Sequence, residues 1–265
     1  MNWDDAYANA AHIPGGADYP DRWAGLAAEH RAVEQAVGRA MLNLRYGEGD
    51  REVQDLFLPA GPAAGLVVFV HGGYWLRFDK SFWSHLAAGP CDRGWAVAIP
   101  SYTLAPDARI GTIVRQTARA VEAAAARVPG PVVLTGHSAG GHLVARVVSA
   151  DVGMRVRDRV RRVVPISPVS DLAPLMRTAM NADLRIDEDE ARSESPVHQP
   201  APEGIEAHVW VGADERPVFL DQARWLAEAW AAPMTVEPGR HHFDVVEGLA
   251  KPDSALSHTL LDGAA

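Results

Sequence analysis

Short segments rich in apolar residues alternate with longer amphipathic segments along most of the chain. The apolar segments lie at residues 66–70, 95–99, 131–135, 160–166, 207–211 and 234–237. Runs of this kind are typical of strands that are buried on both faces of a sheet. Apolar residues at helical spacing occur at residues 81–88, 109–127, 139–150, 218–230 and 254–261. This alternation predicts an α/β fold in which helical crossovers join about eight mostly parallel strands, with helices on both faces.

Three stretches depart from this alternation. Residues 1–21 are rich in Gly, Pro and Asn and predict an irregular N-terminal arm. Residues 22–40 predict a helix, and residues 41–46 and 52–58 a hairpin closed by a Gly-rich turn. Residues 172–204 are polar and contain four prolines, which favours a small lid inserted over the sheet. We therefore expect one domain over residues 1–265. One face of the expected helix carries Trp23, Leu26, Ala27, Val33 and Val37.

Composition narrows the class of protein. The 265 residues carry a formal net charge of −9, which argues against a nucleic-acid partner. Cys91 is the single cysteine, so no internal disulfide forms, and we interpret it as a packed or free thiol. Neither a leader nor a membrane-spanning apolar run is evident. We expect a soluble, cytoplasmic protein with no membrane partner. The oligomeric state stays open, a homodimer being one alternative.

The most informative motif is Gly136-His-Ser-Ala-Gly140, which lies between an expected strand and an expected helix. In this G-x-S-x-G pattern the serine occupies a sharp strand-to-helix turn, where its hydroxyl is presented as a nucleophile. An ordinary Gly-rich turn is the alternative. The flanking strand and helix favour the first interpretation, with Ser138 as the nucleophile.

A serine nucleophile needs a histidine base and a carboxylate that orients the histidine. Asp214 and Glu215 follow the expected strand 207–211, and His241 and His242 follow the last expected strand. Carboxyl ends of parallel strands meet at one sheet edge, so these loops converge on Ser138. The order Ser, acid, His is that of the α/β-hydrolase fold. We favour Asp214 over Glu215 as the acid, whereas spacing alone does not separate His241 from His242.

Backbone N–H groups are the expected donors to the oxyanion that forms when the serine attacks a carbonyl. One is the N–H of Ala139, directly after the nucleophile. The others come from the loop after residues 66–70, at Gly72, Gly73 and Tyr74, where paired glycines let amides turn inward.

Several motifs together resemble the kynurenine formamidase (arylformamidase) branch of the α/β-hydrolase superfamily, near the hormone-sensitive-lipase-like esterases. They are HGGYW at 71–75, SYTLAP at 101–106, GHSAGGHL at 136–143, SPVSDL at 167–172, the lid pattern at 181–196 and HHFD at 241–244. The resemblance implies Ser138 as nucleophile, His242 as base and Asp214 as acid. It also implies hydrolysis of an aryl formamide, N-formylkynurenine, through a covalent acyl-enzyme.

Bulky side chains near the expected site favour a small acyl group. Tyr74 stands where many related esterases have a third glycine and is followed by Trp75, and these two side chains are expected to crowd the acyl side of Ser138. An aromatic leaving group would then meet further aromatic side chains. The candidates are Phe78, Phe82, Trp83 and Tyr102. Packing in the core is the alternative for these aromatic residues, and it is favoured for each except Tyr74 and Trp75.

No paired His, Asp or Glu spacing typical of zinc is present, so we expect a hydrolase without metal or other cofactor, acting on a small molecule. A general short-acyl carboxylesterase is the second hypothesis, since the same residues serve both reactions. A hydrolase-fold binding protein without catalysis is a third, and the complete set of candidate residues argues against it.

Overall fold

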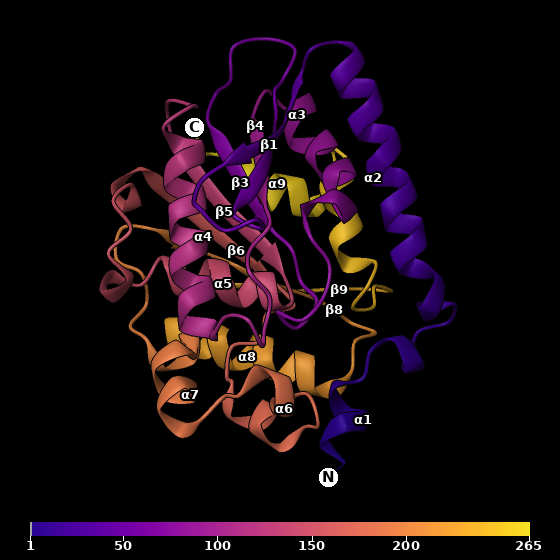
Figure 1. Cartoon of the computed structure of the whole chain (residues 1–265), viewed down its shortest axis with the longest axis vertical. Coiled ribbons are helices and arrows are strands. Elements are labelled where there is room, and N and C mark those ends of the chain that lie inside the picture. Colours follow the sequence, from indigo (N-terminus) through magenta and orange to yellow (C-terminus); the bar gives the residue numbers. More distant parts are fainter. Residues whose placement is uncertain (1) are drawn as a thin grey trace.

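The computed structural model describes residues 2–265 and has one nine-stranded sheet at its centre (Figure 1). Its strands are β1 (Ala40–Arg45), β2 (Val53–Phe57), β3 (Leu66–Val70), β4 (Ala96–Pro100), β5 (Val132–His137), β6 (Val160–Ile166), β7 (Glu206–Ala207), β8 (Val209–Gly212) and β9 (Met234–Glu237). Their order is β1-β2-β4-β3-β5-β6-β8-β9, and β7 pairs with β6. Only β1/β2 and β2/β4 pair in antiparallel fashion. The predicted α/β sheet and its N-terminal hairpin are confirmed.

The middle strands β3, β4 and β5 are buried at every residue, as their apolar sequences require. The pairs β3/β5 and β5/β6 are parallel, and their carboxyl ends are in register. Val70 lies opposite Gly136, and His137 lies opposite Ile166. The loops after β3, β5, β6, β8 and β9 therefore leave the sheet along one edge, where we expected the functional residues.

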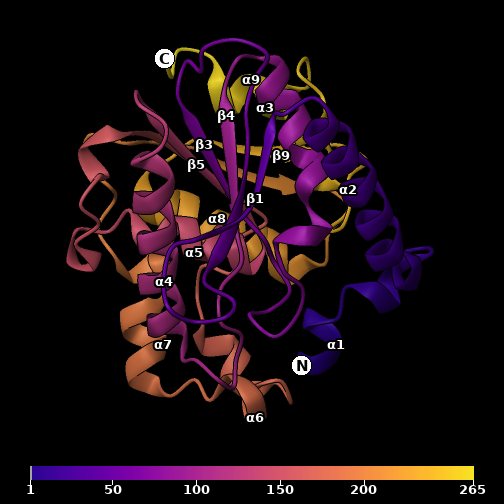
Figure 2. The ribbon, with the colours of Figure 1, turned by 45° about the horizontal axis from the view of Figure 1, so that its top comes forward.

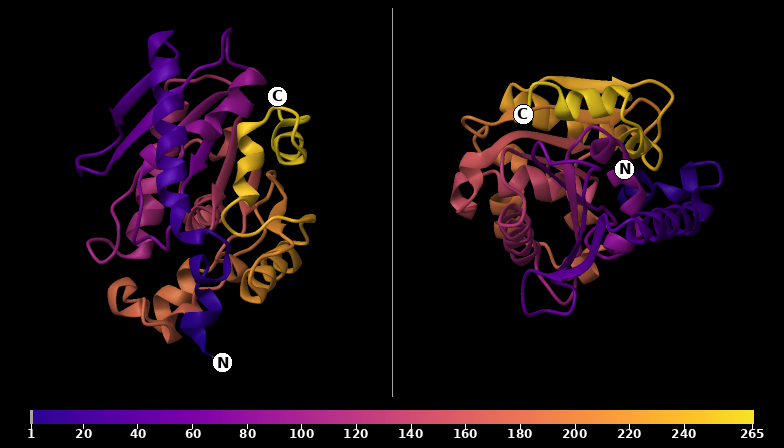
Figure 3. Two further views of the ribbon diagram at one scale, coloured as in Figure 1. Left: turned by 90° about the vertical axis from the view of Figure 1, so that its right-hand side faces the viewer. Right: turned by 90° about the horizontal axis from the view of Figure 1, so that it is seen from above.

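Helices cover both faces of this sheet (Figures 1 and 3). On one face α4, α5 and α8 pack through side chains such as Ile113, Leu143 and Phe219. On the other, α2, α3 and α9 enclose a second apolar cluster that contains Trp23 and Leu256. Their bounds are α2 (Tyr19–Ala36), α3 (Ala88–Asp92), α4 (Ile110–Ala125), α5 (Ala139–Val147), α8 (Pro217–Trp230) and α9 (Ala255–Leu261).

The polar segment 172–204 contains two short helices, α6 (Asn181–Leu184) and α7 (Glu188–Glu194), separated by 3₁₀ turns. They lie together at the end of the molecule where the parallel strands end (Figure 2). Ion pairs connect α7 to the helices beneath it: Arg109 pairs with Asp187 and Glu190, each at 2.8 Å, and Arg146 pairs with Glu194 at 3.1 Å.

The N-terminal region differs from its prediction. Residues 3–7 form a helix, α1 (Trp3–Tyr7), in which the Asn2 side chain accepts from the Asp5 amide and supplies the N-cap. Figure 3 shows α1 beside the segment of α6 and α7. The predicted absence of a regular element in residues 2–21 is therefore wrong for this turn.

Two other predictions need correction. Residues 81–88 form 3₁₀ turns, Lys80–Phe82 and Ser84–Ala87, in place of one α-helix. On α2, Trp23 and Ala27 are buried, while the apolar side chains on their flank are exposed. Those exposed side chains are Leu26, Val33 and Val37. Helix α2 touches the body along a narrow stripe, and Arg31 extends that stripe by donating to the Ser84 hydroxyl at 2.8 Å.

The residues that the structure describes include no helix with both the length and the apolar character needed to cross a membrane.

Candidate active site

Ser138 occupies the turn between β5 and α5. Its backbone has φ 58° and ψ −116°, a conformation that non-glycine residues rarely adopt. Two backbone bonds stabilise the turn: the Ser138 amide donates to the Ile166 carbonyl at 2.8 Å, and the His142 amide donates to the Ser138 carbonyl at 3.0 Å. Only 3% of Ser138 is exposed. The local geometry is that of a strained strand-to-helix turn that presents one hydroxyl.

His242 lies in the loop after β9 and is connected to the same turn. The ring Nε2 of His137 donates to the His242 carbonyl at 2.7 Å, and the two imidazole rings lie 4.7 Å apart. On another side, the Phe219 ring packs on His242 with centroids 4.1 Å apart. The structure thus places His242, which is 3% exposed, next to the residue that precedes Ser138.

The other histidine of this loop has a different environment. His241 Nε2 hydrogen-bonds the Tyr19 hydroxyl at 3.2 Å, and its Nδ1 accepts from the Phe243 amide at 3.1 Å. Both ring nitrogens of His241 are therefore engaged away from Ser138. This geometry favours His242, in agreement with the motif resemblance.

The carboxylate that contacts His242 is Glu215, so the preference for Asp214 is wrong. Glu215 Oε2 accepts from His242 Nδ1 at 2.6 Å, and the Glu215 side chain is fully buried. Asp214 is exposed, and none of residues 2–265 gives its carboxylate a hydrogen-bond or ion-pair partner. The physical reason lies in the turn after β8. The Asp214 amide donates to the Arg240 carbonyl at 2.9 Å, which pairs the backbone at Asp214 with the β9 loop, and the next side chain turns inward.

His137, beside His242, is an uncharged imidazole. Burial, and secondarily the nearness of His242, holds the pKa of His137 well below its usual range. A neutral His137 can donate from Nε2 to the His242 carbonyl without placing a second positive charge beside the His242 ring. The G-x-S-x-G pattern leaves His137 as a variable position and does not indicate this contact.

The loop after β3 lies against Ser138. A Cβ placed on Gly72 would come within 3.0 Å of Ser138 Cβ and 2.7 Å of the His137 carbonyl oxygen. Gly73 has φ 109°, and a Cβ there would meet the Arg77 carbonyl oxygen at 2.6 Å. Within residues 2–265, four amide N–H groups of this loop and of the Ser138 turn donate to no acceptor. Those free donors are Gly72, Gly73, Tyr74 and Ala139.

Tyr74 connects this loop to the N-terminal arm. Its φ is 54°, and its hydroxyl donates to the Tyr7 carbonyl at 2.7 Å. Burial, with Tyr7 and the negative charge of Glu215 nearby, raises the pKa of Tyr74 well above its usual value. Tyr7 also accepts from Gln222 of α8 at 2.8 Å, so the arm packs directly over the loops that carry the candidate residues.

Three of the aromatic residues expected to line a substrate pocket are packed in the core. Trp75 is 0% exposed and packs edge-on against His142. Trp83 stacks on Trp23, and Tyr102 stacks on His71 while donating to the His71 carbonyl at 2.9 Å. These side chains support the loop after β3. The pocket prediction is therefore wrong for Trp75, whereas Trp83 and Tyr102 follow the favoured alternative of packing in the core. Of the set, Tyr74, Phe78 and Phe82 are half-buried.

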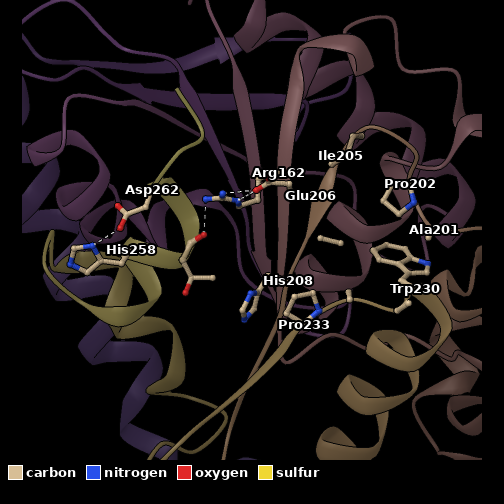
Figure 4. A pocket seen from close by; sticks show the side chains of 14 residues that line it. Arg162, Ala201, Pro202, Ile205, Glu206, His208, Trp230, Pro233, His258 and Asp262 are labelled. Carbon is tan, nitrogen blue, oxygen red and sulfur yellow. Dashed lines mark hydrogen bonds and ion pairs between the residues drawn. The ribbon is translucent and has the colours of Figure 1, made fainter.

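A surface cavity of about 600 Å³ lies elsewhere, near the amino ends of β7, β8 and β9 (Figure 4). In its wall Arg162 donates to the neighbouring Glu206 carboxylate at 2.9 Å, and His258 hydrogen-bonds Asp262 at 3.0 Å. Because these charged groups are paired and lie away from the carboxyl edge, this cavity is not the candidate site. Across residues 2–265 there is no group of three His, Cys, Asp or Glu side chains arranged to bind a metal.

Comparison with known proteins identifies the family of the chain. Residues 67–237 match the model of a family described as the alpha/beta hydrolase fold. A kynurenine formamidase from Salmo salar is 30% identical over 249 residues, which cover 86% of this chain and 84% of that protein.

Among solved structures, one from Silicibacter sp. TM1040, whose protein carries a provisional thioesterase name, is 55% identical. It superposes with a TM-score of 0.95 over 98% of this chain and 99% of that chain. Esterase B from Lactobacillus rhamnosis is 18% identical, with a TM-score of 0.65 over 92% and 91% of the two chains, and shows the shared fold.

Proposed function

Because the chain belongs to the α/β-hydrolase fold family and to the kynurenine formamidase family, it is a hydrolase, and we propose that it cleaves aryl formamides, N-formylkynurenine above all. The products would be kynurenine and formate. The observation that carries this proposal is the buried hydrogen bond from His242 to Glu215 beside the Ser138 turn. This arrangement suits acyl transfer through a serine nucleophile.

In the proposed mechanism, Ser138 Oγ attacks the formyl carbon while His242 Nε2 takes the hydroxyl proton. Glu215 accepts from Nδ1, fixes the tautomer and stabilises the imidazolium. The carbonyl oxygen becomes an oxyanion, which the free N–H groups of the Gly72–Tyr74 loop and of Ala139 would bind. His242 then gives its proton to the aryl amine as the C–N bond breaks. Water attacks the formyl-enzyme by the same route, which releases formate and restores Ser138.

The small exposed fraction of Ser138 supports a short acyl group. With the residue 3% exposed and Tyr74 fixed by Tyr7, little room is left beside the hydroxyl. We therefore propose that formyl and acetyl groups react far faster than long acyl chains. Equal hydrolysis of acetyl and octanoyl nitrophenyl esters would contradict this part of the proposal.

A second candidate is hydrolysis of short-chain esters or thioesters. The observation that favours it is the provisional thioesterase name of the 55% identical Silicibacter structure. Ser138, His242 and Glu215 would act in the same roles on either bond, so the leaving group distinguishes the two candidates.

The deciding experiment compares kcat/KM on N-formylkynurenine, phenyl acetate and S-phenyl thioacetate, with Ser138→Ala as the control. We expect N-formylkynurenine to exceed both esters at least tenfold, a difference of about 1.4 kcal/mol in transition-state stabilisation. A preference for either ester by that factor would replace formamide with ester or thioester hydrolysis. Activity retained by Ser138→Ala would refute the serine mechanism itself.

A further inference from the structure

The Glu215 carboxylate receives three hydrogen bonds, and only one of them comes from His242. Its Oε1 accepts from the Gly212 amide at 2.9 Å and also from the hydroxyl of Ser167. Its Oε2 accepts from His242 Nδ1. Each oxygen of this fully buried group thus has a defined set of donors, and Ser167 is the one side-chain hydroxyl among them.

Ser167 is held in an unusual conformation to make this contact. It is the first residue after β6, is fully buried and has φ 47°, in the left-handed region that non-glycine residues seldom occupy. Its amide donates to the Trp210 carbonyl of β8 at 2.6 Å. This bond joins the ends of β6 and β8, and it places the Ser167 hydroxyl over the turn that carries Glu215.

We propose that Ser167 is a positioning residue of the hydrolase: its hydroxyl fixes the orientation of Glu215 and stabilises its ionised form, and through Glu215 it sets the basicity of His242. The inference rests on the proposed function, since it assumes that Glu215 is the acid partner of His242. Ser167 itself touches neither the substrate nor Ser138 in this scheme.

The surroundings of Glu215 make the Ser167 hydroxyl important. The cation nearest in sequence, Arg216, donates to the Asp5 carboxylate at 2.9 Å. His137 is neutral, because burial lowers its pKa, and Tyr74 keeps its proton because burial raises its pKa. The donors that stabilise the Glu215 carboxylate are therefore the Ser167 hydroxyl, the Gly212 amide and His242, and loss of the hydroxyl leaves Oε1 with one donor.

The test is a double-mutant cycle of Ser167→Ala and Glu215→Gln. The Ser167 hydroxyl stabilises the state in which Glu215 is ionised and His242 is neutral. Without the hydroxyl, this state becomes less stable relative to the state of the pair with one more proton. The pair then binds a proton more readily. We expect the acid limb of the kcat/KM profile to move to higher pH by about one unit, so that kcat/KM falls by up to about tenfold at pH values below the limb. In the Glu215→Gln background the same substitution should cause no further loss.

Ser170→Ala is the matched control. Ser170 follows the same strand and is equally buried, but its hydroxyl donates to the Gln222 carbonyl at 2.5 Å and does not contact Glu215. We expect this variant to lose thermal stability while its acid limb stays at the wild-type pH. Ser167→Gly also removes the hydroxyl, but glycine adopts the positive φ without strain. If it shifts the acid limb as far as Ser167→Ala does, the shift is due to loss of the hydroxyl and not to backbone strain.

Each outcome decides one question. If the losses from Ser167→Ala and Glu215→Gln simply add, or if the acid limb does not move, the positioning role is overturned while the triad stands. If Glu215→Gln retains activity, the acid assignment of the proposed function fails, and the role of Ser167 fails with it.

Discussion

The choice of Glu215 over the neighbouring Asp214 has a large predicted consequence for catalysis. The perturbation is Glu215→Gln, which keeps the size of the side chain but removes its charge. Two donors, the Ser167 hydroxyl and the Gly212 amide, face Oε1. They hold the carbonyl oxygen of the new amide at that position, so its NH₂ group points toward His242 Nδ1.

An NH₂ group at that place reverses the hydrogen bond. His242 Nδ1 must then accept, and the ring proton moves to Nε2, the atom that has to take the proton of Ser138. In comparable triads the wrong tautomer lowers kcat about 10⁴-fold. That factor corresponds to about 5.5 kcal/mol of lost transition-state stabilisation. We expect a fall of about 10³ to 10⁴ in kcat with little change in KM.

The assay is steady-state hydrolysis of N-formylkynurenine by Glu215→Gln and by Asp214→Asn, with circular dichroism as the check of folding. Asp214→Asn is the matched control, because the same charge is removed one residue away at an exposed position. It should retain at least about half of the wild-type kcat, as surface substitutions usually do. The reasoning is refuted if the two variants lose activity to the same extent, or if Asp214→Asn is the more damaged.

Two further predictions concern the loop after β3 and the buried histidines. Gly73→Ala should lower kcat about 100-fold, because its Cβ would meet the Arg77 carbonyl oxygen at 2.6 Å and displace the proposed oxyanion donors. Gly61→Ala is the control: a Cβ at Gly61 would meet nothing within 4 Å, so kcat should not change. An unaltered kcat in Gly73→Ala would show that the loop supplies no donor. Burial lowers the pKa of His71 to about 4 and of His142 to about 3, so below pH 6.5 the unfolded state binds protons that the folded state does not. As the pH is lowered from 6 to 4.5, the free energy of unfolding should therefore fall by about 1.4 kcal/mol per pH unit for each such histidine. Urea titrations at several pH values measure this slope, and His142→Gln should reduce it. A free energy of unfolding that is constant over this range would contradict the assignment of neutral buried imidazoles.

The strands could be predicted because their signal is local. Residues 66–70, 160–166 and 234–237 have the predicted bounds, since apolar segments between turn residues have few other stable conformations. The strand-to-helix turn at Ser138 could be predicted in the same way. G-x-S-x-G between a strand and a helix encodes its geometry within a few residues, and the structure has Ser138 at φ 58°.

The acid could not be chosen in this way, because Asp214 and Glu215 are adjacent and both follow the same strand. What separates them is the pairing of the Asp214 amide with Arg240, a contact between residues 26 positions apart in the chain. Ser167 was missed for the same reason. The SPVSDL motif marked the position, but only the β6–β8 contact shows that its hydroxyl reaches Glu215.

The aromatic residues illustrate a different limit. Trp75, Trp83 and Tyr102 are large and mostly apolar, and such side chains occur both in substrate pockets and in protein cores. The sequence alone therefore does not distinguish the two locations. All three are nearly fully buried, and they pack behind the loop after β3. Likewise Val33 and Val37 have the spacing of a buried helix face, yet α2 makes contact only along the stripe of Trp23 and Ala27. Burial depends on the partner surface, which periodicity does not describe.

Glu215 itself suggests why a longer acid fits this site. Its backbone follows the outward-facing Asp214, yet its carboxylate receives donors from three separate segments: Ser167 after β6, Gly212 at the end of β8 and His242 after β9. The shorter side chain of Asp could not reach all three donors at once, so at least one hydrogen bond would be lost. The donors themselves cannot move closer, because they lie at the ends of paired strands such as β8 and β9. Glu215→Asp should therefore be impaired even though it preserves the charge. That result would identify the position of the carboxylate, and not only its charge, as the requirement for orienting His242.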